Sequence, residues 1–242
     1  MKIKRQSFEE MTWKQLKDLA VIGQLPIGTE ITFDLKNGVP VNATVYGILP
    51  AQDSDQVPGV RFLFDTAVDL HCMNPDWTNR GGYYASACRR HVVRDIMELL
   101  PDDMAEYIRP RKITETLRDA VITYSDPLWL PSETDIFGKG GDSWQNGRAD
   151  GPDDFQLSAC LTDCKRVITL GGEPAWAWLR SVTCASSYGF LISGTDGTIN
   201  RSGANIFRRG GARLRFLIID AENGIRPRKR AIPSKGGSND KA

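Results

Sequence analysis

The apolar and polar positions of residues 12–23 predict an amphipathic helix. Its apolar side chains recur on one helical face: Leu16, Leu19 and Ala20. Thr12 and Gln15 have the spacing of a capping box, in which each side chain bonds to the backbone N–H of the other. Gly23 is suited to the left-handed conformation that commonly ends a helix. The helix is therefore expected to begin after Thr12 and to end near Gly23.

A β-hairpin is predicted over residues 31–45, where apolar and polar residues alternate. The apolar positions lie on both sides of a turn: Ile31, Phe33, Leu35, Val39, Val41, Ala43 and Val45. Asn37 and Gly38 tolerate the positive φ angles of that turn. Pro40 has no N–H to pair, so the second strand should begin irregularly or lie at an edge.

The middle of the chain predicts short elements. Val60–Phe64 is a candidate strand, and residues 85–100 have the periodicity of an amphipathic helix that Pro101 stops. Ser132 is a candidate N-cap for a single helical turn through Phe137.

The C-terminal part predicts β structure after a glycine-rich loop over residues 139–152. Strands are expected near four segments: Trp176–Ser181, Gly189–Ser193, Thr198–Asn200 and Arg213–Asp220. Thr195, Asp196 and Gly197 supply a hairpin turn between two of them. The elements together predict an α+β protein with a twisted antiparallel sheet, two main helices and long irregular loops.

The organisation predicted is one domain over residues 1–223, followed by a tail. The domain contains an N-terminal helix and hairpin (12–48) and a C-terminal β-rich part (174–220). Residues 224–242 are rich in Arg, Lys, Gly, Ser and Pro and lack the apolar residues needed to fold alone. This basic segment is expected to be a flexible tail, with attachment to other proteins of a larger particle as the alternative.

Composition and charge argue against several classes of protein. The chain has 242 residues, of which 40% are hydrophobic and 25% charged, with a net charge of +1. No overall field therefore attracts it to nucleic acid or to a membrane surface. No apolar run reaches the roughly 18 residues of a membrane span. The basic residues 1–6 are not followed by the apolar core of a signal peptide, so synthesis in the cytoplasm is expected, with delivery other than by ordinary secretion.

Cysteine and histidine provide the candidates for catalysis or metal binding. The five cysteines are odd in number and irregularly spaced, which favours reduced and mostly buried thiols. His71, Cys72, Cys88 and His91 could form a cluster that serves an intracellular enzyme or regulator. Their spacing matches no zinc motif, and no nucleophile-elbow, metalloprotease, Walker or dinucleotide fingerprint occurs. No catalytic residue and no metal ligand is therefore assigned, although the enzyme remains the alternative to a binding protein.

Five short blocks, in this order, resemble a domain family of phages, prophages and Gram-positive bacteria that is described as a domain of unknown function (DUF6273). The blocks are Gly81–Ser86 with Arg89, Leu100–Asp103, Trp129–Glu133 with Phe137–Gly138, Trp176–Ser181 and Gly211–Ile219. The last block departs from the family's common Gly-Val-Arg-Pro-Ala-Phe, because Leu214 and Arg215 occupy the positions of the proline and the alanine.

The resemblance implies a C-type-lectin-like fold, which recurs in phage receptor-binding proteins. It also selects a structural signature: Trp129, Glu133, Trp176, Trp178 and Arg180. The last three alternate, so on a strand they would face the same side. Two interpretations follow, a core pillar with Arg180 stacked on the indoles, which is favoured, or an exposed aromatic platform for a sugar or peptide.

A ligand surface is expected on the polar segments that follow this block. Tyr, Ser, Gly and Asn combine contact area with adaptable hydrogen bonds, as in binding loops. The candidate residues are Ser186, Ser187, Tyr188, Asn200, Arg201, Asn205 and Arg208. The alternative is that these are ordinary polar loops on a small sheet.

No cofactor is predicted. Calcium is the minor alternative, with Asp142, Asp150, Asp153 and Asp154 as candidate ligands. The expected function is a non-enzymatic binding or structural module, a receptor-binding or decoration protein of a phage or prophage particle. Its expected partners are a host surface glycan or protein, other virion proteins through residues 224–242, and further copies of itself in a virion-associated homo-oligomer.

Overall fold

The computed structural model describes residues 12–49, 59–117, 120–138, 166–183, 186–206 and 217–221. Within these ranges the protein is mixed α+β, with short helices and small antiparallel sheets. The described strands form four separate sheets of five, three, two and two strands, where the sequence predicted one twisted sheet. Several sequence predictions lie wholly or partly outside the described residues: the loop over 139–152, the candidate calcium ligands, the thiols of Cys160, Cys164 and Cys184, Arg208, the first residues of the strand Arg213–Asp220, and the tail over 224–242.

The largest sheet joins the N-terminal hairpin to the end of the chain. Its strands follow the order β1 (Glu30–Asp34), β2 (Pro40–Leu49), β3 (Gly59–Phe64), β12 (Leu217–Ala221) and β6 (Leu128–Trp129). Every neighbouring pair is antiparallel.

The predicted hairpin is confirmed by the register of β1 and β2, which pairs Glu30 with Thr44 and Asp34 with Pro40. Gly38 occupies the turn with φ 82°. Because β2 lies between β1 and β3, Pro40 is tolerated as the first residue of an interior strand.

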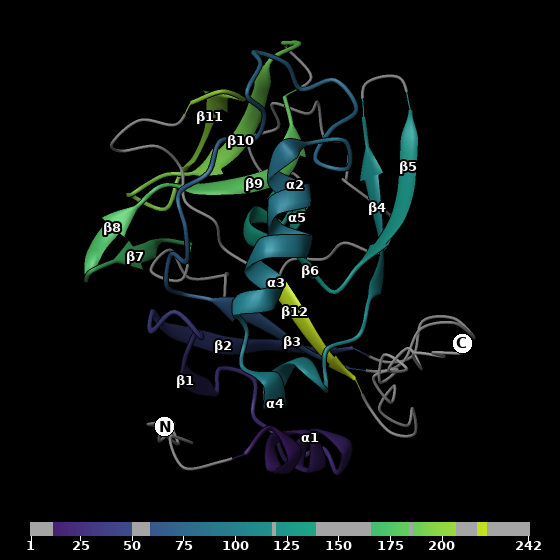
Figure 1. Ribbon diagram of the computed structural model, residues 1–242, viewed down its shortest axis with the longest axis vertical. Coiled ribbons are helices and arrows are strands. Elements are labelled where there is room, and N and C mark those ends of the chain that lie inside the picture. The colour runs from purple at the N-terminus through teal and green to yellow at the C-terminus, as the bar shows by residue number, and fades with distance from the viewer. Residues whose placement is uncertain are drawn as a thin grey trace, which may run out of the picture.

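Helix α1 (Trp13–Val21) packs beside this sheet, at the bottom of Figure 1. The predicted capping box is present, with the Gln15 N–H donating to the Thr12 hydroxyl and the Thr12 N–H donating to the Gln15 side chain. Trp13 contacts the sheet edge-on, with its ring centroid 5.5 Å from that of Phe33 and 6.0 Å from that of Phe62. The aromatic contacts hold the helix against the strands.

The predicted helix over residues 85–100 is also present. It consists of α2 (Ala87–His91), the π-helical turn η1 (Val92–Ile96) and α3 (Met97–Leu99) in direct succession, and α4 (Asp102–Ala105) follows Pro101. Ser86 caps its start by accepting from the Arg89 N–H at 3.0 Å. The π-helical turn was not predicted, since the apolar periodicity does not distinguish a single wider turn from an α-helix.

Two further units were predicted only in part. The sequence from Ile113 to Trp129 predicts a mixture of strand and loop, and it lies largely in the hairpin of β4 (Arg111–Thr116) and β5 (Val121–Asp126). The single turn α5 (Glu133–Phe137) has Ser132 as its N-cap, as predicted, and Asp135 completes a capping box.

The C-terminal strands form a three-stranded sheet in the order β11 (Ile199–Gly203), β10 (Gly189–Ser193) and β9 (Ala177–Val182). The short hairpin of β7 (Ile168–Leu170) and β8 (Glu173–Ala175) precedes it and was not predicted.

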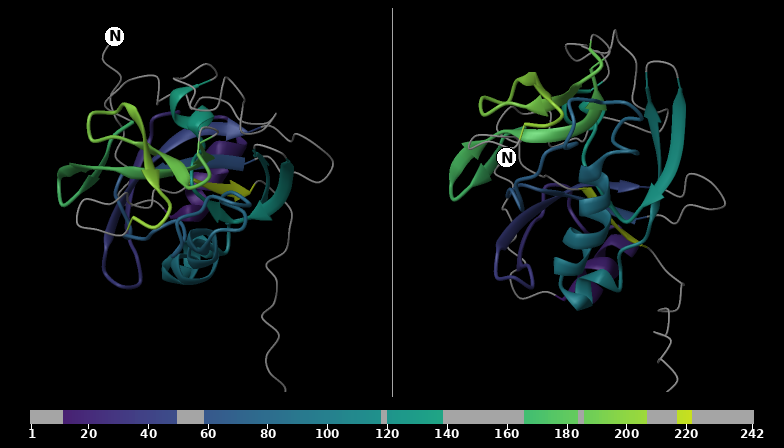
Figure 2. Two further views of the ribbon diagram at one scale, coloured as in Figure 1. Left: turned by 90° about the horizontal axis from the view of Figure 1, so that it is seen from above. Right: turned by 45° about the horizontal axis from the view of Figure 1, so that its top comes forward.

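Figures 1 and 2 place the three-stranded sheet and α1 at opposite ends of the molecule, with the helix α2–α3 between them. One buried hydrophobic cluster extends from Leu16 in α1 through Phe62 and Val92 to Trp178 and Phe190. Helix α1 and the three-stranded sheet therefore share one core.

Candidate functional site

The signature block around β9 is divided between core and surface. Trp178 is fully buried, and its indole N–H donates to the carbonyl of His71 at 2.8 Å. Arg180 is buried as well, but Trp176 precedes the strand and is 40% exposed. The prediction that all three residues share one face is wrong for Trp176, because the strand begins only at Ala177. Trp178 and Arg180 are buried, as the core interpretation predicts, whereas Trp176 is not part of the core.

A buried ion-pair network holds Arg180. Its guanidinium lies 3.8 Å from Asp135, which also bonds to Arg61 at 3.2 Å. All three side chains are almost fully buried. Asp135 compensates both cations, and a buried charge is tolerated only with such pairing.

The other two signature residues fix the segment beside β9. Trp129 is buried in β6, and Glu133 is buried at the start of α5. The Glu133 N–H donates to the Ser181 hydroxyl at 2.8 Å. These four buried residues have a structural role, so the signature identifies the fold and offers no platform.

The block that begins at Gly81 is structural too. Glu115 of β4 is buried and accepts hydrogen bonds from the N–H groups of Tyr83 (2.6 Å) and Tyr84 (3.0 Å). A β-carbon added at Gly82 would lie 2.3 Å from the Glu115 carboxylate, so the turn needs glycine there. The carboxylate thereby fixes the turn that leads into α2.

Arg89 of the same block is held on three sides. Its guanidinium lies over the rings of Tyr84 and Tyr124, 4.8 Å and 4.7 Å from their centroids. It also donates two hydrogen bonds of 2.7 Å to the buried carboxylate of Asp126. This bidentate pair connects α2 to the hairpin of β4 and β5.

Two exposed aromatic residues lie next to each other where strand β11 of the three-stranded sheet ends. Trp77 and Tyr188 are 54% and 40% exposed, and their ring centroids lie 4.9 Å apart. The six-membered ring of Trp77 covers the backbone of Gly203, the last residue of β11. Side chains two residues apart on a strand share a face, so the exposed side chain of Arg201 lies on the face of β11 where a β-carbon of residue 203 would point. Trp77, Ser187, Tyr188 and Arg201 form what we name the Trp77–Tyr188 surface.

Hydrogen bonds from two asparagines connect the backbone segments under this surface. The Asn79 amide donates to the carbonyls of Ser186 (3.0 Å) and Gly189 (2.9 Å), and the Asn79 N–H donates to the carbonyl of Ser187. Asn74 is buried, and its N–H donates to the carbonyl of Ala204 at 3.0 Å. The segment that carries Trp77 is therefore attached to both neighbouring loops, which brings the backbone positions of Trp77 and Tyr188 close together.

The predicted ligand residues are brought together only in part. Ser186, Ser187 and Tyr188 lie beside the end of β11, as the hydrogen bond from the Ala204 N–H to the carbonyl of Tyr188 (2.8 Å) shows. Asn200 is exposed but pairs with Ile192 nearer the hairpin turn. Asn205 is half-buried, and its side-chain oxygen has no partner among the described residues.

Trp77 was missed by sequence reasoning. It stands in a polar segment with Pro75, Asp76 and Asn79, where no apolar period would place it in a core. The turn-forming residues around it predict an exposed position for this side chain, but nothing local in the sequence indicates that it lies against Tyr188.

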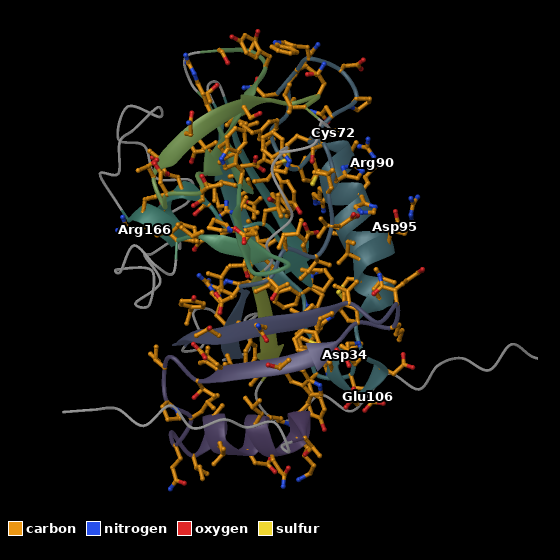
Figure 3. The ribbon with its side chains drawn as sticks, turned by 90° about the vertical axis from the view of Figure 1, so that its left-hand side faces the viewer. Asp34, Cys72, Arg90, Asp95, Glu106 and Arg166 are labelled. Atoms are coloured by element: carbon orange, nitrogen blue, oxygen red, sulfur yellow. The ribbon has the colours of Figure 1, made fainter. Side chains whose placement is uncertain are left out.

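The Cys/His cluster does assemble, on the side of the molecule where Figure 3 labels Cys72, Arg90 and Asp95. His71 and His91 stack with ring centroids 4.4 Å apart. The two ring nitrogens of His91 lie 2.7 Å from Asp69 and 2.8 Å from Asp95. Both nitrogens are thus occupied by carboxylates and are not directed at an open site.

The two thiols near these rings are poorly suited to nucleophilic chemistry. Both are free; Cys88 is fully buried and Cys72 is half-buried. Burial raises the pKa of each thiol above its ordinary value, and by far the more for Cys88. A thiolate at neutral pH is therefore disfavoured at both positions.

Within the described ranges, no group of three or more His, Cys, Asp or Glu side chains could hold a metal ion. No helix in the same part of the chain is long and apolar enough to cross a bilayer.

Comparison with known proteins gave one match. The family model described as a domain of unknown function (DUF6273) matches residues 59–228. A search of curated proteins and a search of solved structures returned no significant match. The matched range covers all five sequence blocks, including the buried signature around β9 and the turn that Glu115 holds. The chain belongs to the DUF6273 family.

Proposed function

We propose that this protein is a non-enzymatic binding module that recognises a molecule on a host surface, a glycan or a protein, through the Trp77–Tyr188 surface. The observation that carries the proposal is an exposed indole that lies against a second exposed ring. Trp77 is more than half exposed, yet its ring lies over Gly203 and against Tyr188, and hydrogen bonds join the backbone segments that carry them. An aromatic side chain offers a large contact area with few rotatable bonds, so its ordering on binding costs little conformational entropy, which favours recognition.

The proposal includes a setting, a receptor-binding or decoration protein of a phage or prophage particle with a C-type-lectin-like fold. The sequence resemblance to a family of phages and prophages supports this setting. The polar segments around the strand ends agree with a fold whose binding residues lie on loops. A homo-oligomer, attached to other virion proteins through residues 224–242, would convert weak single sites into avid binding.

The test uses the full chain, fluorescently labelled, on host cells. We expect wild-type protein to bind cells and Trp77→Ala to lose most of that binding, with light scattering showing an oligomer for both. Immunolabelling of purified particles should place the protein on the virion. A strict monomer that does not bind cells, or equal binding by both proteins, contradicts the proposal.

An intracellular enzyme or regulator that uses the Cys/His cluster is the second candidate, and the stacked pair of His71 and His91 is the observation that favours it. Burial of the Cys88 thiol counts against it. If this candidate is right, alkylation of the thiols or chelation of metal abolishes a measurable activity that Trp77→Ala leaves intact.

A further inference from the structure

We infer that the ligand of the Trp77–Tyr188 surface is a saccharide, with one sugar ring stacked on the indole of Trp77. The inference rests on the proposed binding function and names its ligand class. A pyranose ring has C–H groups on one face and hydroxyl groups around its edge. It therefore fits an exposed aromatic ring that has polar groups beside it, because an aromatic face is apolar and carries partial negative charge.

The surroundings of the two rings match the hydroxyl edge of a sugar. The residues directly next to them in the chain are polar or small: Asp76, Thr78, Ser187 and Gly189. Ser187 and Arg201 are both exposed. A serine hydroxyl donates and accepts, and a guanidinium donates through several N–H groups, so both can bond to sugar hydroxyls.

A protein ligand fits this surface less well. A stable protein–protein contact covers about 800 Å² on each partner and has a core of several apolar anchors. Here the aromatic anchors are Trp77 and Tyr188, whose chain neighbours are polar or small.

An extended peptide could instead add a strand to the exposed edge of the sheet, which is β11. Such pairing needs unoccupied backbone donors along the edge. The N–H of Arg201, in the middle of β11, donates to the side-chain oxygen of Asn200 at 2.7 Å. That donor is occupied within the strand itself, which disfavours strand addition and leaves the side-chain surface as the binding element.

Arrays of immobilised glycans and of peptides, probed with the full chain, test the inference. Three proteins are compared: wild type, Trp77→Ala, and the matched control Trp176→Ala, which removes a second exposed tryptophan from the β8–β9 junction. We expect wild type and Trp176→Ala to bind the same glycans and Trp77→Ala to lose at least ten-fold in affinity, with unchanged circular dichroism.

The outcomes separate the inference from the proposed function. Binding only to peptides, lost in Trp77→Ala, overturns the saccharide and leaves the binding surface standing. Binding to nothing, or binding that Trp77→Ala leaves unchanged, overturns both. If Trp77→Ala does not fold, oxidative footprinting of the wild type decides instead. A bound array glycan should protect Trp77 but not Trp176 from oxidation, and equal oxidation of Trp77 with and without the glycan overturns the inference.

Discussion

The indole of Trp77 lies over the backbone of Gly203, and a β-carbon added at position 203 would come within 3.1 Å of the ring. The two residues belong to distant parts of the chain, yet each defines the position of the other. Gly203 has no positive φ angle, so a larger side chain there would be limited by the space under the indole and not by backbone conformation.

Gly203→Val tests this contact without touching the aromatic residues. The branched side chain should displace the exposed indole, which can move into solvent, so the fold should survive while binding falls several-fold. Acrylamide quenching of tryptophan fluorescence should increase, and the array signal should fall. Unchanged quenching together with full binding would show that the position of Trp77 does not depend on Gly203.

Trp178→Ala and Trp176→Ala separate core from surface within one block. Trp178 is fully buried and bonded to the carbonyl of His71, so its truncation should lower the free energy of unfolding by about 3–5 kcal/mol. Truncation of Trp176, which is 40% exposed, should lower the free energy of unfolding by about 1 kcal/mol or less. Urea unfolding followed by circular dichroism measures both. Similar losses for the two variants would contradict the assignment of Trp178 to the pillar.

Asp135→Asn should break the buried ion-pair network. The variant keeps the shape of the side chain but removes the negative charge that lies 3.2 Å from the guanidinium of Arg61 and 3.8 Å from that of Arg180. We expect the free energy of unfolding to fall by about 3–5 kcal/mol. Asp18→Asn is the control, since its ion pair with Lys14 is exposed and its loss should leave the denaturation midpoint almost unchanged.

Tyr83→Phe should leave the free energy of unfolding unchanged or increase it. The Tyr83 hydroxyl is fully buried and has no hydrogen-bond partner among the described residues, so removing it relieves a desolvation penalty. Tyr124→Phe is the matched comparison, because the Tyr124 hydroxyl donates to Glu115 at 3.3 Å and its removal should cost about 1 kcal/mol. A loss for Tyr83→Phe as large as that for Tyr124→Phe would reveal a partner for Tyr83.

Stability should fall at alkaline pH in part through Cys88. Burial raises the pKa of this thiol above its ordinary value of 9.0. Below pH 9 the thiol is protonated in both the folded and the unfolded state, so the stability that it contributes is fully present. Above pH 9 the unfolded chain loses the thiol proton first, so the free energy of unfolding falls as pH rises. Urea unfolding at pH 7 to 10 should show a shallower decline for Cys88→Ala than for wild type. Parallel declines would assign the effect to other groups.

The elements predicted correctly from sequence are those whose signals are local. The capping box at Thr12, the N-cap at Ser132 and the turn at Gly38 depend on residues within a few positions of each other. The buried thiol of Cys88 followed from its place on the apolar face of a helix. Such features are set by backbone geometry over one turn, so the sequence alone is sufficient to identify them.

The hairpin of β7 and β8 was missed because its strands have three residues each, too few for an alternating pattern to stand out. The different burial of Trp176 and Trp178 was also missed. Their alternation would place them on one face of a strand, but β9 begins between them, and a boundary of one residue is beyond what periodicity resolves.

For the candidate site, the sequence by itself determined the polar loop that contains Ser186, Ser187 and Tyr188, since its composition is local. Only the tertiary structure decided that Trp77 joins them. The Asn79 amide bonds to the carbonyl of Ser186 across 107 residues of sequence, and Trp77 covers Gly203 across a similar separation. Contacts of that range depend on how the strands pack and on where a glycine leaves room, and neither is encoded in the residues adjacent to Trp77.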